Sequence, residues 1–120
     1  MKPEQHIFWI VEMTIKPDAS SDFKQLIIEL VEATQKESGT LNYEWAIAAD
    51  DQTSHVYERY IDSEAAVLHL RSFQEKFAER FMALVDPTRA VLYGNPSAEL
   101  TEIMDGFGAE YLAPAGGFAR

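Results

Sequence analysis

The sequence offers few side chains that could perform chemistry, and the most informative of them is a histidine in a helical segment. His69 lies between Leu68 and Leu70, near the apolar stripe of a predicted helix. Inside an apolar pocket, a neutral imidazole can act as a general base. A lone helical histidine is, however, more often a hydrogen-bonded structural group than a catalyst. Both interpretations of His69 stand at this stage.

A charged pair on the strand before this helix is the next candidate. Glu58 and Arg59 are adjacent, so their side chains point to opposite faces of the strand, and at least one charge is directed toward a covered region. We expect Glu58 to form a salt bridge or a hydrogen bond with a tyrosine rather than to act in catalysis. The aromatic residues of the predicted strands suit a core, a dimer interface or a cavity for a flat ligand. They are Trp9, Tyr43, Trp45, Tyr57 and Tyr60.

Motifs for catalysis or cofactor binding are absent from the sequence. It contains no glycine-rich phosphate loop, no His-Glu-x-x-His pair and no Gly-x-Ser-x-Gly nucleophile motif. It also has no cysteine, which excludes disulfides, thiolate nucleophiles and cysteine-based metal sites. The histidines, His6, His55 and His69, are few and scattered, so we predict no metal site.

Alternating and helical patterns of apolar residues predict the elements that position these side chains. Asp62 and Ser63 cap one long amphipathic helix that carries apolar residues through Leu84. An earlier helix follows Ser21 and stops at Ser38-Gly39, where glycine tolerates a left-handed conformation. The predicted strands are at 6–15, 41–48, 56–61 and 89–93. The resulting β-α-β-β-α-β order is that of a ferredoxin-like α+β fold with an antiparallel sheet.

A ferredoxin-like sheet carries helices on one face only, so its other face needs a cover. Apolar residues occupy both faces of the first predicted strand, and one row would form a larger exposed patch than a soluble monomer usually has. We therefore expect a homodimer whose sheets pack face to face as a dimeric α/β barrel. Residues 1–94 would form this domain, and residues 95–120 a C-terminal helical extension that docks on the barrel or on the partner subunit.

Length, net charge and the lengths of the apolar runs exclude several classes of function. The chain of 120 residues fits one domain with a modest core. A formal charge of -10 argues against nucleic-acid and anionic-membrane partners, which clustered lysine and arginine side chains would capture. Apolar runs fall short of the roughly 18 residues of a membrane span. We expect a soluble, cytoplasmic protein.

Two stretches carry a resemblance to a known family. Gly39-Thr-Leu-Asn-Tyr-Glu-Trp and Val56-Tyr-Glu-Arg-Tyr-Ile-Asp-Ser-Glu-Ala-Ala-Val-Leu-His-Leu, within the predicted element order, resemble the antibiotic biosynthesis monooxygenase family of dimeric α/β barrels. The resemblance covers residues from about 6 to 94, and the remaining tail resembles an extension carried by some members. Relatives include quinol and anthrone monooxygenases, haem-degrading enzymes and small-molecule isomerases.

The resemblance implies oxygenation without metal or flavin, in which an electron-rich phenol or quinol loses a proton and its anion reacts with O₂. The protein then supplies a dry aromatic pocket, a base and donors for oxyanion charge. The implied catalytic residues are His69 as the base, with Tyr57 and Arg59 as donors. The implied substrate-binding residues are Asn42, Tyr43, Trp45 and Phe73. Asn42 differs from Tyr43 and Trp45 in strand parity, so these three side chains share one cavity only if a bulge intervenes.

Three functions remain open from the sequence. The first is a cofactor-independent monooxygenase acting on a small aromatic quinol, phenol or anthrone. The second is a haem-binding or haem-degrading protein, which is disfavoured because the long helix carries no tryptophan. The third is a non-catalytic small-molecule-binding or stress-response barrel, which the lack of a catalytic motif favours.

Overall fold

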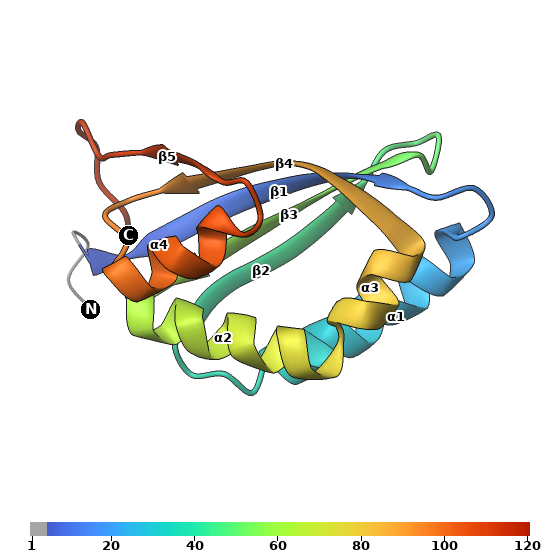
Figure 1. Ribbon diagram of the computed structural model, residues 1–120, viewed down its shortest axis with the longest axis horizontal. Helices are drawn as coiled ribbons and strands as arrows, with labels where there is room; N and C mark the ends of the chain where they lie inside the picture. Colours follow the sequence, from blue (N-terminus) through green and yellow to red (C-terminus); the bar gives the residue numbers. More distant parts are fainter. Residues whose placement is uncertain (1–4) are drawn as a thin grey trace.

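The computed structural model describes residues 5–120, which form one sheet with helices on one of its faces (Figure 1). The sheet has the strand order β2-β3-β1-β4-β5. Its strands are β1 (Ile7–Ile15), β2 (Thr40–Ile47), β3 (Thr53–Tyr60), β4 (Val85–Tyr93) and β5 (Glu110–Leu112). The helices are α1 (Ser20–Thr34), α2 (Ser63–Lys76), α3 (Ala78–Leu84) and α4 (Ala98–Asp105). The predicted β-α-β-β-α-β order and the ferredoxin-like α+β class are confirmed.

The sheet is mixed rather than wholly antiparallel as predicted. β1 pairs antiparallel with β3 and β4, and β2 pairs antiparallel with β3. The short β5 of the C-terminal segment adds parallel to β4. A strand of three residues leaves too little alternation in the sequence to be recognised.

The predicted long helix is interrupted. α2 ends at Lys76, Phe77 has a non-helical φ of -129°, and α3 starts at Ala78. The sequence has neither proline nor glycine at this point, so the break carries no local signal. It brings α3 over the end of the sheet occupied by α1, where Phe81 is buried in the core.

The fourth strand is longer than predicted, because it begins at Val85 and includes Pro87. Proline is tolerated there because the pairing of β4 with β1 shifts register between Glu12 and Met13. Gly39 also differs from the prediction: a side chain there would lie 2.5 Å from the Cβ of Ala65. Close packing against α2, not a left-handed turn, requires glycine at this position.

The core consists of two clusters beneath the helices. One cluster joins β1 and β3 to α1 and α3 around Phe23, Leu26 and Val56. The other surrounds Trp9 and Tyr60 and includes Leu100 and Met104 of α4. The C-terminal segment is therefore packed against the same sheet face as α2, which α4 also contacts.

Candidate active site

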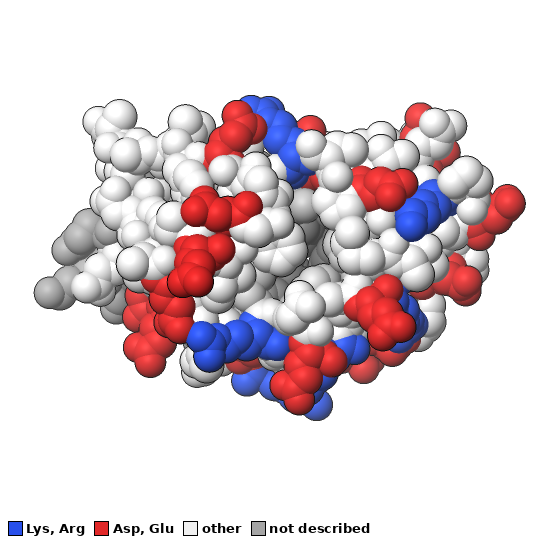
Figure 2. All heavy atoms as spheres, in the orientation of Figure 1, with Lys and Arg blue, Asp and Glu red and all other residues white. Residues whose placement is uncertain are grey.

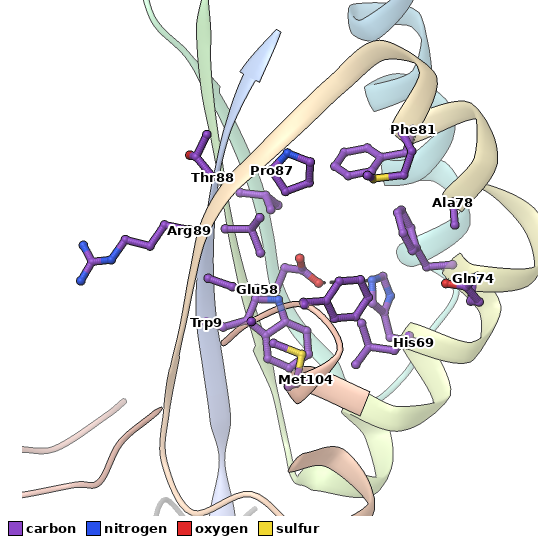
Figure 3. A pocket seen from close by; sticks show the side chains of 18 of the residues that line it. Trp9, Glu58, His69, Gln74, Ala78, Phe81, Pro87, Thr88, Arg89 and Met104 are labelled. Carbon is purple, nitrogen blue, oxygen red and sulfur yellow. Dashed lines mark ion pairs between the residues drawn. The ribbon is translucent and has the colours of Figure 1, made fainter. Parts of the chain in front are cut away.

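A cavity of about 630 Å³ lies between the sheet and α2, where the two core clusters meet. Figure 3 shows side chains from the sheet, from α2 and α3 and from the C-terminal segment facing one another around it. Its inner wall is largely apolar and aromatic. The lining includes Trp9, Val11, Tyr43, Trp45, Val56, Glu58, His69, Leu70, Phe73, Phe81, Met104 and Phe107. A volume in this range accommodates a drug-sized molecule of more than one ring.

Most of the charged side chains on this face lie around the cavity rather than in its lining, which includes Glu58, Glu79 and Arg89. Figure 2 shows a hollow near the middle of this face that is bordered by uncharged residues, with acidic side chains gathered over α4. The acidic surface agrees with the net charge of -10 and disfavours a highly anionic ligand.

His69 projects from α2 into the space beneath the sheet, and both of its ring nitrogens contact carboxylates. Nδ1 lies 2.8 Å from Glu37 Oε1, and Nε2 lies 3.2 Å from Glu58 Oε1. Glu37 follows α1, whereas Glu58 comes from β3, so three separate elements meet at this ring. Figure 3 shows Glu58 and His69 pointing toward each other across the cavity wall. We call Glu37, His69 and Glu58 the carboxylate–histidine row.

The row fixes the charge of the imidazole. Burial alone would lower the pKa of His69, but its hydrogen bonds to Glu37 and Glu58 outweigh burial and raise the pKa to about 9. Burial would likewise raise the pKa of Glu37, yet the hydrogen bond with His69 holds that pKa below its ordinary value. At neutral pH, His69 is therefore an imidazolium that donates from both nitrogens, and it is not the free base expected from the sequence.

Glu58 is the carboxylate of the row that combines burial with access to the cavity. It is only 7% exposed, and its Oε1 accepts hydrogen bonds from His69 and, at 2.5 Å, from the hydroxyl of Tyr60. The expected tyrosine hydrogen bond and salt bridge of Glu58 are thus confirmed. A carboxylate at a cavity wall is also a proton acceptor, so the structural role of Glu58 does not exclude a chemical one.

Tyr43 and Trp45 of β2 add polar hydrogens to the same wall. The ring of Tyr43 lies 5.3 Å from that of His69. Burial, reinforced by the charge of Glu58, raises the pKa of the Tyr43 phenol, so it stays protonated. Within residues 5–120, the buried indole nitrogen of Trp45 has no acceptor in good geometry, although the Tyr43 hydroxyl lies near it. Both groups can donate to an oxygen of a bound molecule.

The predicted site residues divide between the two faces of the sheet. His69, Tyr43, Trp45 and Phe73 line the cavity. Tyr57, Arg59 and Asn42 lie on the opposite face. There Arg59 donates to Asn42 Oδ1 at 3.2 Å and to His6 Nδ1 at 3.0 Å, and Phe8 packs against Tyr57. The expected difference in parity between Asn42 and Trp45 holds, since the irregularity in β2 precedes Asn42.

Glu37 is the participant that sequence reasoning missed. It lies in the turn between α1 and β2, outside every periodic pattern. Met104 and Phe107, in the C-terminal segment, also line the cavity but are not among the predicted site residues. Among residues 5–120, no three histidine, cysteine or acidic side chains are grouped to hold a metal ion. No helix in the same range is long and apolar enough to cross a membrane.

The sequence profile described as "antibiotic biosynthesis monooxygenase" matches residues 7–74, which is more than half of the chain. The chain belongs to this family. The matched segment contains the complete carboxylate–histidine row. A comparison with curated proteins gives no match.

Solved structures agree with this family assignment at the level of the fold. MupZ from Pseudomonas fluorescens has a TM-score of 0.85 at 21% identity, over 97% of this chain and 95% of its own. SnoaB, a cofactor-independent oxygenase from Streptomyces nogalater, has a TM-score of 0.65 at 14% identity, over 78% and 96%. A protein from Methanosarcina mazei has a TM-score of 0.68 at 23% identity, over 77% and 94%.

The known proteins compared above match the N-terminal part of this chain more widely than they match its C-terminal segment. The match to the antibiotic biosynthesis monooxygenase profile ends before α4, and the likeness to SnoaB covers about four fifths of this chain. The likeness to MupZ covers nearly the whole chain, so it extends into α4 and β5. Within this family fold, α4 and the residues after it therefore supply an additional part of the cavity wall.

Proposed function

We propose that this protein is a cofactor-independent monooxygenase that deprotonates a small aromatic quinol, phenol or anthrone and lets the resulting anion react with O₂. The observation that carries the proposal is the contact between Glu58 and His69, 3.2 Å apart and buried at the wall of an aromatic cavity. Membership of the antibiotic biosynthesis monooxygenase family and a fold like that of the oxygenase SnoaB support it.

Glu58 is the base in this proposal, in place of His69. Its carboxylate takes a proton from the substrate, and the adjacent imidazolium keeps a positive charge near the anion that forms. Tyr43 and the indole N–H of Trp45 are available as donors to the developing oxyanion. Removal of water from an apolar cavity strengthens each of these interactions.

The substrate itself supplies the electrons. For an anthrone, the ring methylene loses its two hydrogens and becomes a carbonyl, while O₂ provides the carbonyl oxygen and one molecule of water. The proton first taken by Glu58 returns to the peroxide oxygen that leaves as water. The atoms therefore balance without an external reductant, and the protein need only deprotonate, orient and exclude solvent.

Oxygen consumption tests the proposal. The protein, without added metal or flavin, is mixed with anthrone, a naphthohydroquinone and 1-naphthol in turn, while O₂ uptake and products are recorded. We expect uptake of about one O₂ per anthrone consumed, faster than the uncatalysed reaction by 10²-fold or more. Saturable binding of these compounds without any catalysed uptake would contradict the proposal and favour a non-catalytic binding barrel.

A second candidate function is proton transfer without oxygen, such as an isomerisation. The observation that favours it is the adjacency of a carboxylate acceptor and an imidazolium donor at one wall. Anaerobic incubation in D₂O separates the two candidates: an isomerase incorporates deuterium into product without O₂, whereas the oxygenase forms no product under these conditions.

The histidines that could bind haem iron give less support to the haem alternative. Both ring nitrogens of His69 are held by carboxylates, so this histidine offers no free nitrogen to an iron atom. His6, on the other face of the sheet, accepts a hydrogen bond from Arg59 through Nδ1. A haem titration that produces a Soret band at stoichiometric haem would restore this alternative.

The proposal includes a homodimer formed through the sheet face that no helix covers. The helices formed by residues 5–120 cover one face of the sheet, as Figure 1 shows. The other face carries half-exposed aromatic residues, among them Phe8 stacked on Tyr93 with ring centroids 4.8 Å apart. A second copy that packs this face against its own would bury these rings, as the sequence pattern already suggested.

A further inference from the structure

Resting on the proposed function, we propose that Glu37 is a positioning residue that keeps Glu58 ionised and able to act as a base. Glu37 does so by binding the Nδ1–H of His69 and so preventing the imidazolium from giving its Nε2 proton to Glu58. Glu37 is not among the residues that line the cavity, so it acts on the reaction only through His69.

The contacts of His69 place the two carboxylates at different ring nitrogens. Glu37 Oε1 lies 2.8 Å from Nδ1, and Glu58 Oε1 lies 3.2 Å from Nε2. Of these two carboxylates, Glu58 is the one that lines the cavity and can accept a proton from a bound molecule. The contact with Glu37 lies on the side of the ring away from Glu58, where it can fix the charge of the imidazole without occupying the base.

A buried pair of one histidine and one carboxylate can lose both charges by a single proton transfer. The side chains of His69 and Glu58 are only 5% and 9% exposed, so little water reaches either charge. Ordinary pKa values of histidine and glutamate differ by about two units, and burial can shift either type of group by more than that toward its neutral form. In an isolated pair the Nε2 proton would pass to Glu58, and the base would be protonated before a substrate arrives.

Glu37 opposes this transfer because it places a second negative charge beside the ring. Transfer of the Nε2 proton would leave Glu37 ionised next to a neutral imidazole, and the attraction across their 2.8 Å contact would be lost. Thr40 holds Glu37 in place, because its hydroxyl donates to Oε1 at 2.8 Å. The contact therefore keeps the positive charge on His69 and the negative charge on Glu58.

The same contact matters after Glu58 has accepted the substrate proton. Glu58 is then neutral, and the imidazolium keeps Glu37 as its counter-charge beside the substrate anion. The ring can therefore stabilise that anion until the proton returns from Glu58 to the departing peroxide oxygen. Both N–H protons of His69 stay in place throughout, so the only proton that moves within the row is the one on Glu58.

Other groups around the imidazole do not replace Glu37. Tyr60 and Tyr43 pack against the ring, and burial raises the pKa of both phenols, so they are uncharged at neutral pH. The Tyr60 hydroxyl donates to the base, which favours its ionised form, but it offers no negative charge to the imidazolium. Lys76 is a cation near Glu37 and favours the ionised form of that carboxylate.

Spectra of the substrate-free protein test the proposal. Glu37→Gln keeps a hydrogen-bond acceptor for Nδ1–H and removes the charge. At pH 7, nitrogen-15 NMR should show His69 as an imidazolium in wild type and as a neutral ring in Glu37→Gln, with the signals assigned by their loss in His69→Gln. Infrared spectra of Glu37→Gln should gain the C=O stretch of a protonated carboxyl, and this band should vanish when Glu58→Gln is added.

Two further variants serve as controls. Glu32→Gln removes an exposed carboxylate of α1 and should give the wild-type spectra. Glu37→Asp keeps the negative charge on a shorter side chain and should keep the imidazolium, which a purely steric role of Glu37 does not predict. Circular dichroism checks the folding of each variant.

Turnover as a function of pH provides the second readout. At pH 7, Glu37→Gln should have a kcat about tenfold or more below wild type, with KM within roughly threefold. Its rate should rise between about pH 6 and pH 8, as the proton shared by His69 and Glu58 is lost. The wild-type rate should instead fall as pH passes about 9, where the imidazolium loses its proton.

These readouts distinguish failure of the positioning role from failure of the proposed function. If His69 stays an imidazolium in Glu37→Gln and no protonated carboxyl appears, the positioning role is wrong whatever the turnover. If the spectra change as expected but Glu37→Gln oxidises anthrone as fast as wild type at pH 7, the positioning role is also wrong and the oxygenase stands. If the spectra change but wild type oxidises no compound, Glu37 still sets the charges of the row and the oxygenase assignment falls.

Discussion

The two faces of the sheet each hold a histidine beside a charged partner, and they give these histidines opposite charge states. On the covered face, His69 lies between two carboxylates, and its hydrogen bonds to them overcome burial and raise its pKa to about 9. On the open face, burial and the adjacent Arg59 both lower the pKa of His6, which accepts a hydrogen bond from the guanidinium. At His69 the partner carboxylates outweigh burial, whereas at His6 burial is the larger cause and the charge of Arg59 acts in the same direction.

The comparison also separates two kinds of surface. The covered face holds a cavity that opens at the molecular surface and is lined by aromatic side chains, with α4 as part of its wall, and Glu58 and His69 compensate each other's charge there. The open face exposes stacked aromatic rings beside polar contacts among Arg59, Asn42 and His6. We assign chemistry to the first face and subunit contact to the second, and each prediction below tests that division.

The largest expected effect concerns Glu58 and Arg59, adjacent residues on opposite faces of β3. Glu58→Gln removes the proposed base and should lower kcat by about 10²- to 10⁴-fold. Arg59→Gln changes the other face and should leave kcat within roughly threefold of wild type. Oxygen uptake with anthrone measures both, with circular dichroism as the check of folding. Equal losses of kcat in the two variants would contradict the assignment of the chemistry to the covered face alone.

The second prediction concerns stability and pH. The pKa of His69 is about 9 in the folded protein against 6.5 for the unperturbed group, so folding retains its proton. Its contribution is complete below about pH 6.5 and disappears as pH rises through about 9, which amounts to about 3 kcal/mol of unfolding free energy. Urea unfolding of wild type should show this decrease.

His69→Gln should lose that pH dependence, whereas His55→Gln, at an exposed position of β3, should retain it. An identical pH profile in wild type and His69→Gln would mean that the imidazole is not held as a cation by its two neighbours.

The fold follows from the sequence more completely than the site does. Alternation in β1 and β3 and the helical stripe from Ala66 to Phe73 predict their elements correctly, because burial on one side imposes a period on the sequence. The break at Phe77 and the pairing of β5 with β4 leave no such period. They result from tertiary contacts, namely the packing of Phe81 and the docking of the C-terminal segment.

For the site too, the sequence predicts the residues that follow a periodic pattern and misses those that do not. Parity correctly separates Glu58 from Arg59 and Tyr43 from Asn42, but parity alone does not state which set faces the helices. The tyrosine and ionic contacts of Glu58 were predictable because a buried charge needs a partner. Glu37 was not, since it reaches His69 from a turn 32 positions earlier in the chain.

The third prediction concerns the open face. Phe8→Arg places a charge within the aromatic cluster and should weaken a homodimer by about 2 kcal/mol or more, equivalent to roughly 30-fold in Kd. Leu68→Arg is the control, because Leu68 is 65% exposed on α2, away from this face. Sedimentation velocity over a range of concentrations measures both. Wild type that remains a folded monomer at micromolar concentration would refute the dimer itself.

The smallest expected effect concerns the wall that α4 and the residues after it add to the family fold. Phe107 lines the cavity yet is half-exposed, so it contributes part of one aromatic face to a bound ligand. Loss of that contact in Phe107→Ala should weaken binding of 1-naphthol by about 1 kcal/mol, or roughly fivefold. Phe118→Ala, a largely exposed position in the same segment, should leave affinity unchanged.

Tryptophan fluorescence reports this binding directly, because Trp9 and Trp45 both line the cavity. The core cluster that contains Tyr60 of β3 and Leu100 of α4, both fully buried, should keep its stability in both variants, so a change in affinity reports the wall alone. Equal affinities for Phe107→Ala and Phe118→Ala would mean that the ligand binds beneath the sheet without reaching the C-terminal segment. In that case the family domain contains the whole site, and the extension only shields it from water.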